Sequence, residues 1–341
     1  MEDRAEYSCS ILHSLSSILH RNIELMAAIE ITIRPLRESD LPDADRIYRL
    51  AFGSFIGLPD PMTFAGDTEY VRTRWLADPA SALGAESAGA LIGSNFLTNW
   101  GSVGFFGPLT IRPDFWGKGV ASRLLGPTMD IFAEWGTKLA GLYTFAQSAK
   151  HVHLYQKFGF WPQFLTAVMT KPVDQPLTAS SWSGFSEMAG QERDGCLKAC
   201  AELTCAIYEG LNVEREIRAV AEQKLGETVM VWDGSRLAGF AVCHCGAGSE
   251  AGSGALYVKF GAARPGLAAE QNFMRLLEAC EVFAASRGLE KLVAGVSTAR
   301  VAAYRRMLAR GFRSFTQGVA MLRSEDQGYN RPDVYVIDDW R

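Results

Sequence analysis

A short glycine-rich run constrains the fold of this chain more than any other feature. The run Trp116-Gly117-Lys118-Gly119-Val120-Ala121 lies between a strand-like segment ending in Ile111-Arg112-Pro113 and a helix-like segment that begins near Ser122. Glycines let consecutive backbone N–H groups converge on an anion, and the N-terminus of the following helix adds partial positive charge. The run therefore predicts a pyrophosphate cradle, although an ordinary strand-to-helix turn can have the same composition.

A second motif lies further along the chain. Leu154-Tyr155-Gln156-Lys157-Phe158-Gly159-Phe160 is typical of a helix that ends at a glycine before a new apolar strand. Together with Leu109-Thr110-Ile111 ahead of the glycine run, the two motifs at this spacing resemble the acyl-CoA-binding core of the GNAT N-acetyltransferase superfamily. Upstream, Ile31 to Leu41 resembles the opening strand and first helix of that family.

The resemblance and the order of elements predict two tandem copies of one fold. A chain of 341 residues with 48% hydrophobic residues can form two cores. Residues from Pro172 to Ser183 have the composition of a linker, and the same order of strands and helices recurs after it. We expect an α/β fold with a mixed sheet in each of two GNAT-like domains. The predicted parts are an N-terminal extension (1–26), a GNAT-like domain with the acyl-CoA site (27–172), a linker (173–184) and a second GNAT-like domain (185–341).

The second copy lacks a closely spaced Gly-Lys-Gly run. After Gly261 the chain reads Ala262-Ala263-Arg264-Pro265-Gly266, where Pro265 also removes a backbone donor. We therefore expect a degenerate domain with a structural or substrate-shaping role. A second acyl-CoA site remains the alternative.

The resemblance also implies the residues of the cofactor site. They are the strand residues, the glycine run with its flanks, and two residues of the second motif: Leu109, Thr110, Ile111, Trp116, Gly117, Lys118, Gly119, Val120, Ala121, Ser122, Ser148 and Tyr155. Trp116 stands where the family has Gln or Arg, which removes one polar contact to the cofactor. Ser148 stands where many members have Asn, and is a shorter partner for the pantetheine arm.

Two residues are expected to handle protons. Tyr155 matches the family position whose phenol protonates the departing thiolate of CoA, and the alternative is a packed tyrosine at a helix end. Glu86, in the expected second strand, is the first candidate for a general base; Glu69, Asp60 and Asp67 are the others. His151 and His153 flank the motif on different helix faces, so we expect at most one to face the cleft. A backbone N–H near Leu109 or Ile111 is expected to bind the oxyanion.

The net charge and the composition exclude some classes of binding partner. A net charge of −4 argues against nucleic acid, and no apolar run approaches the ~20 residues of a membrane span. Seven cysteines without paired CxxC spacing indicate reduced thiols, a cytoplasmic setting and no metal site, with Cys243 and Cys245 as a minor metal-binding alternative. The sequence leaves a homodimer open.

These features predict an N-acetyltransferase. It would transfer an acetyl group from acetyl-CoA, its cosubstrate, to an amine of a small molecule or a peptide by direct attack. Phe52, Phe55 and Phe64 lie where the family builds its acceptor pocket and suggest an apolar or aromatic acceptor. The alternative is a non-catalytic acyl-CoA or metabolite sensor. A Rossmann dinucleotide site is disfavoured because the run lacks the third glycine and follows several strands.

Overall fold

The computed structural model describes residues 30–173 and 181–341. The predicted N-terminal extension and most of the predicted linker lie outside the described residues. The first half means residues 30–173 below, and the second half means residues 181–341. Within these two ranges no helix combines the length and the apolar character needed to cross a membrane.

The two halves contain similar series of strands and helices. The first half contains β1 (Thr32–Pro35), α2 (Leu41–Ile56), α3 (Val71–Ala77), β2 (Ala82–Ser87), β3 (Ala90–Trp100), β4 (Val103–Ile111), α4 (Val120–Glu134), β5 (Leu139–Thr144), α5 (Ala149–Gln156) and β6 (Trp161–Pro172). The second half contains β7 (Ser183–Gly184), α6 (Gln191–Ile207), α7 (Glu214–Gln223), β8 (Gly226–Asp233), β9 (Arg236–Gly246), β10 (Gly252–Ala263), α8 (Ala269–Ser286), β11 (Lys291–Ser297), α9 (Val301–Ala309), β12 (Arg313–Leu322) and β13 (Val336–Ile337). The expected repeat of elements is present; α7 and β13 were not anticipated.

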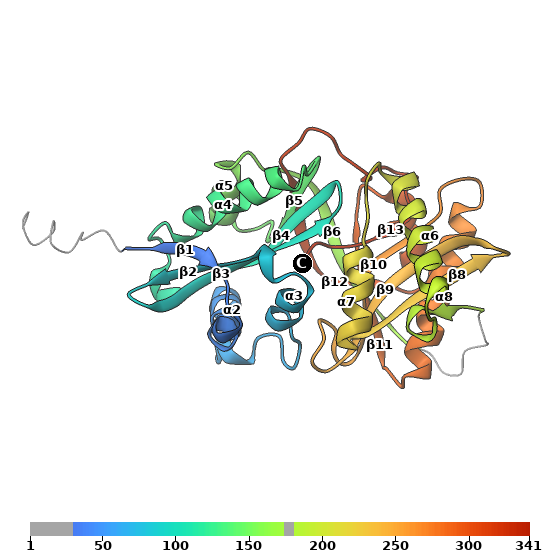
Figure 1. The fold of residues 1–341 in the computed structure, drawn as a ribbon, viewed down its shortest axis with the longest axis horizontal. Helices are drawn as coiled ribbons and strands as arrows, with labels where there is room; N and C mark the ends of the chain where they lie inside the picture. Colours follow the sequence, from blue (N-terminus) through green and yellow to red (C-terminus); the bar gives the residue numbers. More distant parts are fainter. Residues whose placement is uncertain (1–29, 174–180) are drawn as a thin grey trace, which may run out of the picture.

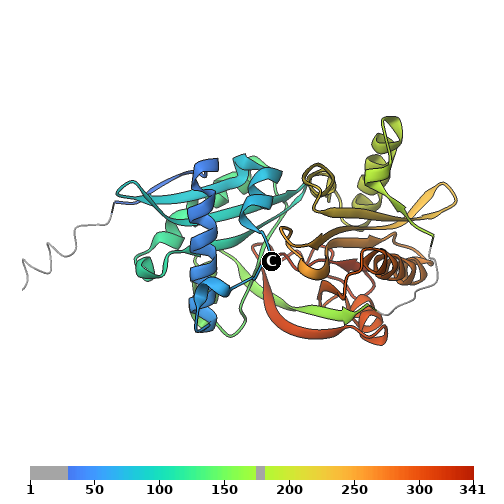
Figure 2. The same ribbon diagram turned by 90° about the horizontal axis from the view of Figure 1, so that it is seen from below.

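One mixed sheet runs through both halves, as Figure 1 shows. The strand order in the described residues is β1-β2-β3-β4-β5-β12-β6-β11-β10-β9-β8-β7, with β13 paired to β10. The two halves exchange their last long strands: β12 of the second half pairs with β5, and β6 of the first half pairs with β11. β6 and β12 pair with each other between the halves (Figure 2). The predicted division of the chain into two domains at 173–184 stays a prediction. β6, which precedes this division, pairs with β11 and is thereby joined to the second half.

Strand alternation directs side chains to helices on both faces of the sheet. In β3, Phe96 packs with α2 while its neighbour Leu97 packs with α4. In β8, Met230 packs with α6 and α7 while Val231 packs with α8. The core that contains Met230 also includes aromatic residues of the first half, so the two halves share buried apolar surface.

The segment after β12 returns to the middle of the molecule (Figure 1). β13 adds to β10 beyond the point where β10 pairs with β11, with Gly261 opposite Ile337. Trp340 then stacks on Phe105 of β4, with ring centroids 5.6 Å apart. A Cβ at Gly141 of β5 would lie 2.3 Å from the Trp340 ring, so only glycine allows this approach. The end of the second half is thus packed into the first.

A buried charge network also joins the halves. Arg74 of α3 donates from Nε and Nη2 to the two carboxylate oxygens of Glu250, each at 2.9 Å, and from Nη1 to the carbonyl of Gly107 in β4 at 2.5 Å. Lys259 Nζ lies 2.8 Å from Glu250 and 3.1 Å from Glu216. Burial alone would raise the pKa of Glu250, but Arg74 and Lys259 outweigh burial and hold the pKa well below its usual range. Glu250 therefore stays ionised.

Substitution of Glu250 should destabilise the protein strongly. Glu250→Gln leaves Arg74 and Lys259 buried with less negative charge, and we expect the free energy of unfolding to fall by about 3–5 kcal/mol. Denaturant unfolding measures this change. Glu214→Gln is the matched control, because it removes an exposed i,i+4 pair with Arg218 and should cost under about 0.5 kcal/mol. Because the folded pKa of Glu250 is depressed, its stabilisation is present at neutral pH and is lost as the pH falls below the ordinary carboxyl range. Equal losses of unfolding free energy in Glu250→Gln and Glu214→Gln would contradict a special role of the buried network.

Candidate functional site

The site begins where β4 and β5 separate. These parallel strands pair only from Val103 to Phe106 of β4, and β5 then pairs with β12 on its other side. The N–H of Arg112 donates to the carbonyl of Ile92 in β3 at 2.9 Å. Because successive residues of a strand direct their backbone groups to opposite sides, Leu109 and Ile111 direct theirs into the gap. The gap thus has one edge of β4 that pairs with no strand of the described residues, as an added strand or an extended ligand would need.

The glycine run crosses the open end of this gap. Gly117 and Gly119 both have φ +78°, and a Cβ at either would meet open space, so glycine is required by the backbone angle and not by lack of room. Gly119 is the N-cap of α4. In the described chain, five amides of this turn have no protein acceptor, those of Gly117, Gly119, Val120, Ala121 and Ser122. They form an anion cradle at a helix N-terminus.

Trp116 joins the two sides of the gap. Its Nε1 donates to the carbonyl of Ile111 at 2.8 Å, and Lys150 Nζ lies 5.8 Å from the centre of its ring. The indole therefore donates a hydrogen bond to one carbonyl of β4 that faces the cleft. It also holds a lysine of α5 beside the anion cradle.

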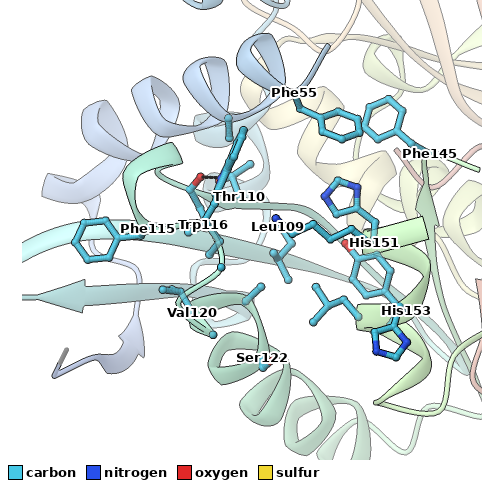
Figure 3. A pocket seen from close by; sticks show the side chains of 18 of the residues that line it. Phe55, Leu109, Thr110, Phe115, Trp116, Val120, Ser122, Phe145, His151 and His153 are labelled. Carbon is cyan, nitrogen blue, oxygen red and sulfur yellow. Dashed lines mark hydrogen bonds between the residues drawn. The ribbon is translucent and has the colours of Figure 1, made fainter. Parts of the chain in front are cut away.

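Two cavities meet in this gap. The first, about 320 Å³ and named the cofactor cavity for the group that the sequence predicts in it, is lined by the ends of α2 and β4, the glycine run and α5 (Figure 3). The inner cavity, about 410 Å³, lies between α2, β4, β5, β12 and the end of the chain. Both are lined by Phe52, Leu109, Phe145, His151 and Tyr155. These shared residues mark where a group bound in one cavity would meet a group bound in the other.

Tyr155 lies at this junction. Its side chain is buried, and its ring packs edge-on against Phe106 with centroids 5.7 Å apart. Burial raises the pKa of Tyr155 to about 12, and the side chain of Thr144 acts in the opposite direction. The phenol is therefore protonated across the physiological range and can only donate its proton.

His151 lies one helical turn before Tyr155 on the same face of α5. Its ring packs against Phe55 at 4.8 Å and Phe145 at 6.4 Å, which Figure 3 shows at one end of the pocket. Burial, followed by the positive charge of Lys150, lowers the pKa of His151. His153 also lines the cofactor cavity, so both histidines border the cleft. The expectation that at most one would do so is wrong.

Most predicted cofactor residues line the cofactor cavity. Leu109, Thr110, Ile111, Trp116, Gly117, Gly119, Val120, Ala121, Ser122 and Tyr155 are all in its wall. Lys118 and Ser148 are not: the Lys118 Nζ lies 4.8 Å from the centre of the Phe115 ring, and Ser148 is the N-cap of α5. The backbone turn at Lys118 belongs to the cradle although its side chain lies outside the wall.

The structure does not bring Glu86 to either cavity. Its carboxylate accepts a hydrogen bond from Arg34 Nε at 2.7 Å. β2, which carries Glu86, lies in the outer part of the sheet, and β3 lies between it and the strands that border the gap. Asp60 and Glu69 accept backbone amides of their own turns, and Asp67 binds Ser253. No aspartate or glutamate of the described chain lines either cavity. The titratable side chains that line both cavities are instead His151 and Tyr155, and sequence reasoning had set the histidine aside.

The inner cavity is mostly aromatic. Its walls include Tyr48, Phe52, Phe64, Tyr70, Phe106, Tyr143, Phe145, Tyr155, Phe315 and Trp340. Phe315, Thr316, Trp340 and Arg341 come from the second half and were not predicted. Only the exchange of β12 and the return of the chain to Phe105 bring them here, and no local sequence pattern signals it.

Comparisons with known proteins agree with this geometry. Residues 44–160 match the model of the acetyltransferase (GNAT) family. A search of curated protein sequences finds no match. Among solved structures, the chain resembles a putative acetyltransferase from Pyrococcus horikoshii (TM-score 0.64, 14% identity, covering 91% of this chain and 95% of that one). It also resembles a GCN5-related N-acetyltransferase from Sphaerobacter thermophilus (TM-score 0.53, 15% identity, covering 89% and 96%).

A third structure extends the likeness. It is a GCN5-related glucosamine N-acetyltransferase region of a fungal multi-domain β-N-acetylglucosaminidase, with a TM-score of 0.60 and 12% identity, covering 87% of this chain and 38% of that one. At these identities the structural matches show the fold, while the sequence match covers the splayed strand, the glycine run and α5. Residues 44–160 thus match the GNAT acetyltransferase family, and the described residues share the fold of the solved acetyltransferases to which the chain is similar.

Proposed function

We propose that this chain transfers an acetyl group from acetyl-CoA to the amine of a small apolar or aromatic acceptor. The observation that carries the proposal is the junction of the two cavities at Tyr155, between a cradle of free amides and an aromatic chamber. The pyrophosphate of CoA would bind the amides of the glycine run. Its pantetheine arm would pair with β4 as an added strand, which delivers the thioester to the junction.

The inner cavity is the proposed acceptor site. Its aromatic walls favour an apolar body, and burying an ammonium group without a carboxylate partner is costly. The acceptor amine is therefore expected to bind uncharged. The N–H of Leu109, which is directed into the gap, is the proposed donor to the oxyanion of the tetrahedral intermediate. Tyr155 would protonate the leaving thiolate.

A non-catalytic acyl-CoA sensor is the alternative function. Such a protein needs the cofactor cavity alone. The second cavity, which opens at the position of the thioester, favours transfer to an acceptor over sensing.

We expect one acetyl-CoA per chain. In the second half the edge of β10 beyond its pairing with β11 is occupied by β13, which takes the place an extended cofactor arm would fill. Calorimetric titration of the full-length protein measures the stoichiometry. Two sites would show that the second half binds acyl-CoA, and no binding would refute the proposed function.

Substitutions at Gly119 should weaken cofactor binding. Gly119→Ala adds a Cβ in open space but opposes φ +78°, so we expect about a 5- to 30-fold loss of acetyl-CoA affinity, equivalent to about 1–2 kcal/mol. Gly119→Pro also removes an amide and should abolish binding. Gly136→Ala is the control, since Gly136 has φ +64° and open space at the other end of α4. An equal loss in the control would show that the effect is general destabilisation.

Removal of the Tyr155 hydroxyl should affect turnover and not affinity. Tyr155→Phe keeps the ring packed against Phe106 and is expected to lower the rate of CoA release by about 10²- to 10⁴-fold. The affinity for acetyl-CoA, measured by calorimetry, should stay the same. Tyr208→Phe, which removes a hydroxyl bonded to Asp326 outside the two cavities, is the control. Unchanged turnover in Tyr155→Phe would leave this tyrosine a packing role.

A further inference from the structure

We propose that His151 is the general base of the transfer and takes up at Nε2 the proton that the acceptor nitrogen loses. This inference rests on the proposed function and adds the residue that it lacks. His151 lines both cavities, and it lies one turn before Tyr155 on one face of α5. A base and an acid are therefore placed side by side at the junction.

The imidazole of His151 makes no hydrogen bond to any of the described residues. Its Nδ1 is enclosed without a partner. Nε2 is then the nitrogen that opens to the cavities. A histidine retained for packing normally satisfies its buried nitrogen, whereas this ring packs against the rings of Phe55 and Phe145 with its buried nitrogen unpaired among the described residues. Its accessible nitrogen is thus available to a ligand.

The surroundings keep the ring uncharged. The tautomer with its lone pair at Nε2 carries its proton at Nδ1, so protonation adds a positive charge at Nε2, and no aspartate or glutamate of the described residues lines either cavity to compensate. The other titratable groups that line the two cavities are lysine, arginine, histidine and tyrosine side chains: Lys150, His153, Tyr155, Lys157, Tyr48, Tyr70, Tyr143 and Arg341. The guanidinium of Arg341 is paired with Asp339 at 3.0 Å. These surroundings are consistent with the lowered pKa of His151, so that Nε2 has a free lone pair at neutral pH.

The proton transfers balance within the site. The neutral acceptor nitrogen forms a bond to the thioester carbon, and its proton passes to His151 Nε2. The carbon–sulfur bond then breaks, the sulfur keeps the electron pair, and Tyr155 donates its proton to the sulfur. The imidazolium finally returns its proton to the Tyr155 phenolate, one turn away on α5. The products are the N-acetylated amine and CoA with its thiol, and both residues are restored without an outside acid.

The test compares His151→Gln with wild type in the full-length protein. Acetyl-CoA binding is measured by calorimetry, and CoA release is measured with 4-methylaniline and 2-phenylethylamine as acceptors. We expect turnover to fall by about 10²- to 10⁴-fold with unchanged affinity for acetyl-CoA. Gln156→Ala on the same helix, which lines neither cavity, is the matched control and should behave as wild type. Added imidazole should partly restore the activity of His151→Ala.

The pH profile separates a base from a packing role. With 4-methylaniline as acceptor, whose amine is uncharged at neutral pH, wild-type turnover should be constant around neutral pH and fall at acidic pH as the ring is protonated, because the pKa of His151 is lowered. In His151→Gln this limb should disappear. Unchanged turnover, or an unchanged pH profile at reduced turnover, would overturn the proposal.

Failure of the proposed function would have a different signature. If wild type does not bind acetyl-CoA, the function itself is wrong. If it binds acetyl-CoA but acetylates neither amine, the acceptor class is wrong, and nitrogen NMR of the histidine rings with acetyl-CoA bound decides the role of His151. A neutral ring that titrates below its usual pKa supports the proposal, and a ring charged at neutral pH overturns it.

Discussion

The pairing of β12 with β5 is the contact on which the rest of the molecule depends. It inserts a strand of the second half into the first, displaces β6 to β11, and so makes one sheet of what the sequence presents as two. The buried network of Arg74, Glu250 and Lys259 also joins the halves, and Arg74 binds the carbonyl of Gly107 where β4 leaves β5. The opening of the cleft is thus tied to the joining of the halves.

The two halves use the same splayed strands differently. In the first half the gap beside β4 is bordered by free amides and opens to solvent through the glycine run. In the second half the corresponding edge of β10 is covered by β13, which Arg300 holds by donating to the Val336 carbonyl and to Asp338. The chain then continues to Trp340 in the wall of the inner cavity. One short segment therefore closes one cleft and shapes the other.

The chemistry of the junction follows from what surrounds it. Aromatic walls, with no aspartate or glutamate of the described chain lining either cavity, disfavour a cation at the junction. Burial moves the pKa values of these two groups apart, down for the imidazole and up for the phenol. A pair separated in this way has one member ready to accept a proton and the other ready to donate one.

The sequence by itself determined the local parts of this protein. The glycine angles, the strand before them and the helix end at Tyr155 depend on residues near one another in the chain, so motif and periodicity predicted them and the cofactor cavity that they form. Glu86 lies away from both cavities, and the order of strands along the chain did not reveal this distance. The exchange of β12, the closure by β13 and the positions of Phe315 and Trp340 were decided only by tertiary structure. Strand partners are selected by total burial and packing across the whole molecule, and no local residue pattern encodes that sum.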